Sequence, residues 1–196
     1  MAYKFLDKYP YLTPLSVTST ESRVISESIN LKRKSIRKNA QRFDFTITLT
    51  DAANANLHSD LMGHWFTYGM ETPFYIDVPQ PLFTDDLTIG SGIAVSGAHL
   101  AGDDTINIVS GGYFKIPAGR FITFNGHSKL YVVKETLEGY NGILKIGPAL
   151  VAPVSSGATV FINDVQAYVL NEADNSVFSY ESGIIQSATL KFIENV

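Results

Sequence analysis

The side chains best suited to acid–base or metal chemistry in this chain are its four histidines. His58 and His64 lie six residues apart, which is about 600° of helical turn, whereas a zinc-binding helix presents two histidines at i and i+4. His127 follows a tight turn, and His99 lies in a glycine-rich stretch with no second ligand nearby in the sequence. No motif supplies a nucleophile together with an orienting group. The sequence therefore predicts neither a catalytic histidine nor a metal site.

Two pairs of aspartates, Asp85-Asp86 and Asp103-Asp104, could in principle bind Ca²⁺ or act as an acid/base pair. Neither pair fits the Asp-x-Asp-x-Asp-Gly spacing of a calcium loop, and paired aspartates in the loops of a β protein usually form solvated turns. The glycines form no phosphate-binding pattern between a strand and a helix. We therefore expect no cofactor and no enzymatic activity.

The composition is that of an ordinary globular protein with 196 residues, of which 45% are hydrophobic and 17% charged. This length allows one large or two small domains. The absence of cysteine excludes disulfides and thiolate metal sites. The first residues, MAYKFLDKYPYLTP, lack the apolar core of a secretory signal, and no apolar run approaches membrane-spanning length. We expect a soluble protein with no membrane partner, used without export by a signal of its own.

Positive charge is concentrated in residues 23–42, which hold seven of the 15 Lys and Arg residues and one acid, although the whole chain has a net charge of −4. Such a segment could bind nucleic acid. However, no aromatic residues for base stacking are interleaved with it, and the pI is about 5.5. We predict a solvated hairpin arm, or an arm that contacts an acidic neighbouring subunit, without specific nucleic-acid binding. The candidate interface residues are Arg33, Lys34, Arg37, Lys38 and Arg42.

The elements around this segment are predicted to be mostly strands. Residues 43–50 alternate apolar and polar without interruption, which indicates a strand with one buried face. A helix is expected over about residues 51–68, because Leu57, Leu61, Trp65 and Tyr68 recur at helical spacing. The strand pattern resumes at residues 74–78 and is ended by two prolines.

The central residues 85–162 read as a separate β unit with its own turns. Asn125-Gly126 and Asn141-Gly142 are strong hairpin signals, and Pro117-Ala118-Gly119 favours a type I turn. A last strand, residues 184–193, alternates as residues 43–49 do. We infer that the C-terminus returns to the first sheet. The predicted domains are therefore residues 1–84 with 163–196, and an inserted domain of residues 85–162.

The order of these features resembles the distal tail proteins (Dit) of long-tailed, non-contractile bacteriophages, the siphophages. The resemblance rests on the basic segment followed by Arg42-Phe43-Asp44-Phe45, the helix, Thr72-Pro73-Phe74, the all-β insert and the closing Leu190-Lys191-Phe192-Ile193-Glu194. Within the insert, Tyr113 to Gly119 and Lys129 to Val133 look like inserts of phage tail-tip proteins. The fold that it implies is mainly β, with a β-sandwich-like first domain carrying one α-helix and an inserted small β-barrel of the OB-like kind.

The resemblance also implies a function. Dit proteins are structural proteins of the tail tip, or baseplate, that assemble, typically as hexamers, into a ring joining the tail tube protein to the tail hub protein. The ring carries peripheral receptor-binding or fibre proteins. The expected location is the tail tip of the virion, after synthesis in the cytoplasm of the host bacterium.

Two other readings remain open. The insert could be a carbohydrate- or receptor-binding module of a phage tail, because OB-like barrels bind sugars and nucleic acids on an exposed sheet face. Its candidate ligand face is formed by Tyr113, Tyr131 and Tyr140, although alternate members are expected in the core. A tail-associated glycan hydrolase would need two carboxylates across a cleft. Glu135 and Glu138 lie three residues apart, and nothing places them opposite another acid.

Overall fold

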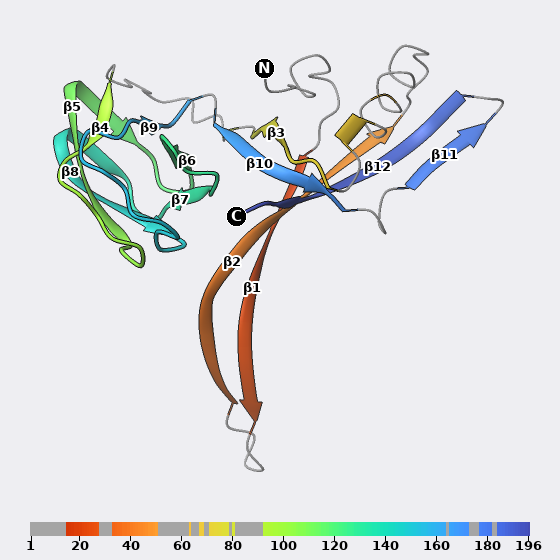
Figure 1. Cartoon of the computed structure of the whole chain (residues 1–196), viewed down its shortest axis with the longest axis horizontal. Coiled ribbons are helices and arrows are strands. Elements are labelled where there is room, and N and C mark those ends of the chain that lie inside the picture. Colours follow the sequence, from red (N-terminus) through yellow and green to blue (C-terminus); the bar gives the residue numbers. More distant parts are fainter. Residues whose placement is uncertain are drawn as a thin grey trace. The chain divides into compact units, whose positions relative to one another are not determined.

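The computed structural model describes residues 15–27, 33–50, 63, 67–68, 71–78, 80, 92–163, 165–172, 177–181 and 184–196. It shows a mainly β protein whose described strands form two sheets (Figure 1). The chain divides into two compact units, residues 1–76 with 168–196 and residues 77–167. We call the first the sheet unit and the second the barrel unit.

The sheet unit contains one six-stranded sheet among its described residues, in the order β1-β2-β12-β10-β3, with β11 also paired to β12. The described pairings of β1 with β2 and of β12 with β2, β10 and β11 are antiparallel. The C-terminal strand thus lies beside β2, with Phe192 opposite Phe45. The strands are β1 (Leu15–Glu27), β2 (Arg33–Thr50), β3 (Phe74–Asp77), β10 (Gln166–Asn171), β11 (Val177–Glu181) and β12 (Ile184–Glu194).

One face of this sheet is built by the alternation that the sequence shows in β2. Phe43, Phe45 and Ile47 are buried, and the residues between them are not. On the same sheet, Phe74 of β3 meets Phe192 of β12 edge to face, with ring centroids 5.5 Å apart. Aromatic pairs in this geometry stabilise the fold by more than the burial of their surface area alone. The expected strand over residues 43–50 is therefore confirmed, and its apolar face belongs to the core.

The predicted helix over residues 51–68 lies almost entirely outside the described residues. Of that range only Gly63, Thr67 and Tyr68 are described, in helical conformation, and the Thr67 hydroxyl donates to the carbonyl of Gly63. The Tyr68 ring lies 5.2 Å from that of Phe74, which belongs to the buried face of the sheet. A second sheet facing this one, as in a sandwich, is not seen in the part of the chain that the structure describes.

β1 and β2 form a long antiparallel hairpin that continues beyond the rest of the sheet (Figure 1). β12 pairs with β2 only from Asp44 to Thr50, whereas β1 accompanies β2 along almost its whole length. Residues 21–27 and 33–41 therefore form a ribbon of two strands, with an irregularity between Glu21 and Arg23. We call this ribbon the arm.

The barrel unit contains a second sheet of six strands in the order β4-β5-β8-β7-β6-β9, all paired antiparallel. A bridge between Ala94 in β4 and Thr159, just before β9, joins the two ends of the sheet. The Val95 N–H also donates to the carbonyl of Ala158 at 2.9 Å. The sheet is thus nearly closed into a barrel. Its strands are β4 (Ile93–Val95), β5 (Thr105–Ile116), β6 (Phe121–Phe124), β7 (Tyr131–Val133), β8 (Leu137–Gly147) and β9 (Val160–Phe161).

The barrel has a continuous apolar core because its strands alternate inward and outward residues. In β5, for example, Ile106, Ile108, Phe114 and Ile116 are buried. An OB-fold has five strands, whereas the described barrel has six, so its strand number differs from that of the predicted OB-like domain. The sixth strand is β9, which lies on the far side of β6 from β7. The unit's bounds, 77–167, are also wider than the predicted 85–162.

Two of the three predicted turns are confirmed, and one is wrong. Asn125-Gly126 connects β6 to β7, and Gly119 ends the turn between β5 and β6, both glycines having positive φ. Asn141-Gly142 instead lies inside β8, opposite Val109 and Ile108. A Cβ atom at Gly142 would lie 2.7 Å from Cδ1 of Leu137, so a larger residue there would require the Leu137 side chain to shift.

Candidate functional site

The predicted interface residues all lie on β2, and four of them fall in the arm. Arg33 stands opposite Glu27, Lys34 opposite Ser26 and Arg37 opposite Arg23. Lys38 falls in the irregular stretch, where no partner is assigned in the register. The arm as a whole carries five basic and two acidic residues. The structure therefore gathers this charge on one two-stranded ribbon.

Arg42 has a partner within the chain. Its Nε atom lies 3.0 Å from Oδ1 of Asp44, two residues further along β2. The hydroxyl of Thr20, which is the register partner of Arg42, donates to the other oxygen of the Asp44 carboxylate. Contact with a second subunit through Arg42 would therefore compete with this internal ion pair.

Tyr131, predicted as part of a ligand face, belongs instead to the core of the barrel. The side chain is fully buried, and its ring packs edge to face on Phe124 at 5.4 Å. Its hydroxyl accepts from the N–H of Val151 at 3.3 Å and lies 3.1 Å from Nδ1 of His127. β7 is only three residues long, and pairing on both sides turns Tyr131 and Val133 inward. The assignment of Tyr131 to a ligand face is therefore wrong.

Tyr113 and Tyr140 are both exposed and lie together on the outer face of β5 and β8. Their side chains are 43% and 61% exposed, and the ring centroids are 5.8 Å apart at an interplanar angle of 77°. The structure thus brings together two of the three tyrosines of the predicted ligand face.

The two described histidines, His99 and His127, make hydrogen bonds to neighbouring segments of the main chain. His99 Nε2 accepts from the N–H of Asn107 at 3.0 Å, and Nδ1 lies 3.5 Å from Asp103 Oδ2. His127 Nε2 lies 3.3 Å from the carbonyl of Pro153. A carbonyl can only accept, so this Nε2 carries a proton, and in the neutral ring Nδ1 then accepts from the Tyr131 hydroxyl. Among the described residues no group of three His, Asp or Glu side chains could hold a metal ion, and His58 and His64 lie outside them.

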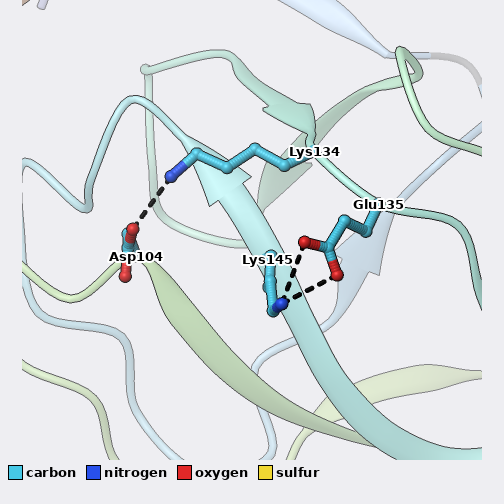
Figure 2. A network of polar contacts seen from close by, with 4 residues as sticks. All are labelled: Asp104, Lys134, Glu135 and Lys145. Carbon is cyan, nitrogen blue, oxygen red and sulfur yellow. Dashed lines mark hydrogen bonds and ion pairs between the residues drawn. The ribbon is translucent and has the colours of Figure 1, made fainter.

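The described acidic residues singled out in the sequence are mostly engaged in surface contacts (Figure 2). Asp104 pairs with Lys134 at 2.8 Å, and Glu135 with Lys145 at 2.7 Å. The hydrogen bond and charge of Lys134 hold the pKa of the Asp104 carboxyl below its usual range. Glu135 therefore binds a lysine rather than facing a second acid, while Asp85-Asp86 lies outside the described residues.

The structure also reveals two buried cations that sequence reasoning missed, Arg120 and Lys129, which are 4% and 0% exposed. Arg120 Nε donates to the carbonyl of Ile162 at 3.2 Å, and Nη2 donates to Oδ1 of Asn163 at 2.8 Å. Burial lowers the pKa of its guanidinium below the ordinary value. Arg120 directly follows a Pro-Ala-Gly turn, which is a pattern typical of an exposed residue, so the sequence held no signal of its burial.

Comparison with known proteins gave no family assignment. No protein-family model matches the chain, and no curated protein matches it with significant similarity. Within the described residues no helix is long and apolar enough to cross a membrane.

Proposed function

We propose that this chain is a structural protein of a phage tail tip that assembles through its arm into a ring, as the resemblance to distal tail proteins implies. In this proposal the sheet unit, with the helix over residues 51–68 and a sandwich-like arrangement, carries the assembly. The ring joins the tail tube protein to the tail hub protein, and the barrel units decorate it. The single observation that carries the proposal is the arm.

The arm is long for a ribbon of two strands. An isolated two-stranded hairpin is at best marginally stable in water, and three or more strands or a packing partner are needed for independent stability. β1 stands at the end of the strand order, and β12 pairs with β2 only from Asp44 onward. An open strand edge is a ready template for another chain. A second copy that packs against the arm would supply a partner that the described strands do not provide.

The charge of the arm favours the same conclusion. Arg23 and Arg37 are register partners, and like charges directly opposite one another are destabilising. Residues outside the arm carry the excess acid, since the whole chain has a net charge of −4 while the arm has five bases and two acids. An acidic surface of a neighbouring subunit would offset this repulsion and give the contact a strong dependence on salt.

The test is the molar mass of the protein by light scattering at low and high salt, followed by negative-stain images of any ring. We expect an oligomer for the wild type. The triple variant Arg33→Glu, Lys34→Glu and Arg37→Glu should dissociate it, because exposed charges interact over about 10 Å at 0.1 M salt.

A matched control reverses three lysines of the barrel unit, Lys115, Lys134 and Lys145, and should keep the oligomer. Circular dichroism should show that both variants remain folded. A monomeric wild type at every concentration would overturn the proposal. An arm variant that has the mass and salt dependence of the wild type would show that the arm is a solvated face.

A further inference from the structure

We propose that the outer face of β5 and β8 is a binding site for an uncharged saccharide, with Tyr113 and Tyr140 as its contact rings. This inference concerns the barrel unit alone and can hold or fail whatever the arm does. The site, called here the tyrosine face, consists of six exposed residues in the central part of the two strands: Asn107, Val109, Tyr113, Tyr140, Asn141 and Ile143. The same strands also expose Thr105, Gly111, Glu138 and Lys145.

An irregularity in β5 places the two rings together. Val109 pairs with Asn141 and Phe114 pairs with Gly139, so residues 110–113 stand opposite Tyr140 alone. Bulges of this kind re-aim a side chain and are frequent beside functional sites. Gly111 lies in the bulge with open space around it, since a Cβ there would meet nothing within 4 Å. The backbone thus departs from the regular ladder at the point where Tyr113 meets Tyr140.

The apolar residues of this face form two neighbouring pairs, Tyr113 with Tyr140 and Val109 with Ile143. Asn107 pairs with Ile143 and Val109 with Asn141, so Val109 and Ile143 are diagonal neighbours. They are 43% and 58% exposed, beside tyrosines of similar exposure. Single exposed apolar residues are normal on a protein surface, whereas a contiguous group marks an interaction site. Of the eight most exposed large apolar side chains in the described chain, four lie on this face.

The charge of the face selects the class of ligand. None of its six residues is charged, and the exposed charges of the same strands, Glu138 and Lys145, lie at its margins. At one end Glu138 is the register partner of Lys115, and at the other Lys145 is held by Glu135, so charges are balanced at both margins. A nucleic acid would require uncompensated Lys or Arg for its phosphates. An uncharged ligand is the complement of this surface.

A pyranose matches the chemistry of these groups. The face of an aromatic ring carries negative charge density and attracts C–H groups, while its edge is positive. With the rings at 77°, one tyrosine can lie under the apolar side of a sugar while the other stands beside it. Asn107 and Asn141 are exposed on the same face, and each amide offers donors and an acceptor for sugar hydroxyls.

Saturation-transfer NMR on the full chain tests the site with three uncharged probes: hexamers of β-1,4-linked N-acetylglucosamine, β-1,4-linked glucose and α-1,4-linked glucose. At millimolar concentration, at least one probe should receive magnetisation from the protein. Tyr113→Ala and Tyr140→Ala should each weaken its titrated affinity by tenfold or more.

The matched control is Phe161→Ala, which removes another exposed aromatic ring, 43% exposed, on β9 of the same barrel. Its affinity should equal that of the wild type. The proposal is overturned if no probe binds, or if the control weakens binding as much as the tyrosine variants. It is also overturned if no probe binds while Tyr140→Ala abolishes self-association, because the face would then be a protein interface.

Discussion

The side chain of Gln80 pairs with the main chain of Phe121 as a neighbouring strand would. Nε2 donates to the Phe121 carbonyl at 3.0 Å, and Oε1 accepts from the Phe121 N–H at 3.1 Å. The carbonyl of Arg120, one residue earlier, accepts from the N–H of Val133 in β7. Successive residues of a strand direct their main-chain N–H and C=O groups to opposite edges of the strand. Gln80 therefore covers the edge of β6 that β9 covers at Thr123.

Gln80→Ala should lower the free energy of unfolding by about 1–3 kcal/mol, because two part-buried main-chain groups lose their partner. Gln80→Glu keeps an acceptor for the N–H but sets a carboxylate against the carbonyl, so it should also destabilise. Urea denaturation measures both. As a control, Gln41→Ala removes a hydrogen bond between exposed side chains and should change stability little. Equal stability of Gln80→Ala and the wild type would show that water replaces the contact.

Tyr131→Phe should destabilise the barrel, whereas Tyr140→Phe should not. The Tyr131 hydroxyl is buried with its side chain and accepts from the Val151 N–H, which would lose that partner. A buried unsatisfied group costs about 1–3 kcal/mol. The Tyr140 side chain is 61% exposed, so its hydroxyl can bond to water. Thermal melts of the two variants compare the same chemical change, and similar melting temperatures would contradict the buried network.

The ion pair of Asp104 and Lys134 should be visible in a pH titration. Lys134 holds the pKa of the Asp104 carboxyl below the usual value of about 3.9. A depressed pKa in the folded state gives stability that is present above the unfolded value and is lost as pH falls through the folded one. The contribution is small because both side chains are about half exposed.

Lys134→Met should therefore raise the pKa of Asp104. This pKa is measured from the NMR chemical shift of the carboxyl carbon as a function of pH. Lys145→Met is the matched control, since the charge of Lys145 lowers the pKa of Asp104 less than Lys134 does, and Lys145 binds Glu135 instead. It should raise the pKa less. A larger effect of Lys145→Met would mean that the two pairs of Figure 2 exchange partners in solution.

The strands could be predicted where alternation is long. The alternation over residues 43–50 allows only one set of alternate residues to face the core. Phe45 in β2 and Phe192 in β12 are buried as expected. β7 has only three residues, so the sequence does not show which of its side chains face the core until the neighbouring strands are known. For this reason Tyr131 could not be separated from Tyr113 and Tyr140 by sequence.

Glycine was the second source of error, because it serves turns and close packing alike. Gly126 has positive φ in a turn, as Asn-Gly predicts. Gly142 makes room for Leu137 inside a strand, which is a tertiary contact with no local signature. The proximity of Tyr113 and Tyr140 likewise depends on a bulge whose presence follows from the register of β5 and β8.

The barrel unit should fold by itself as the fragment 77–167. It has its own apolar core, and its two ends are joined to each other. The Val78 N–H donates to the Val165 carbonyl at 2.9 Å, and Gln166 Nε2 donates to Asp77 Oδ1 at 2.8 Å. The fragment should give a β-type circular dichroism spectrum and a cooperative melt.

The shorter fragment 85–162, drawn from sequence alone, is the informative comparison. It lacks Gln80 and the buried Val78 and Val165, so it should melt at a lower temperature than the fragment 77–167.

Deletion of the barrel unit tests the same division from the other side. Because the two ends of the barrel unit are hydrogen-bonded to each other, a short Gly/Ser linker can replace the unit in the full chain at a loop-closure cost that depends weakly on length. The shortened protein should fold and keep the oligomeric mass of the wild type. If neither fragment folds and the shortened chain does not either, the two sheets depend on each other for stability and the division into units is wrong.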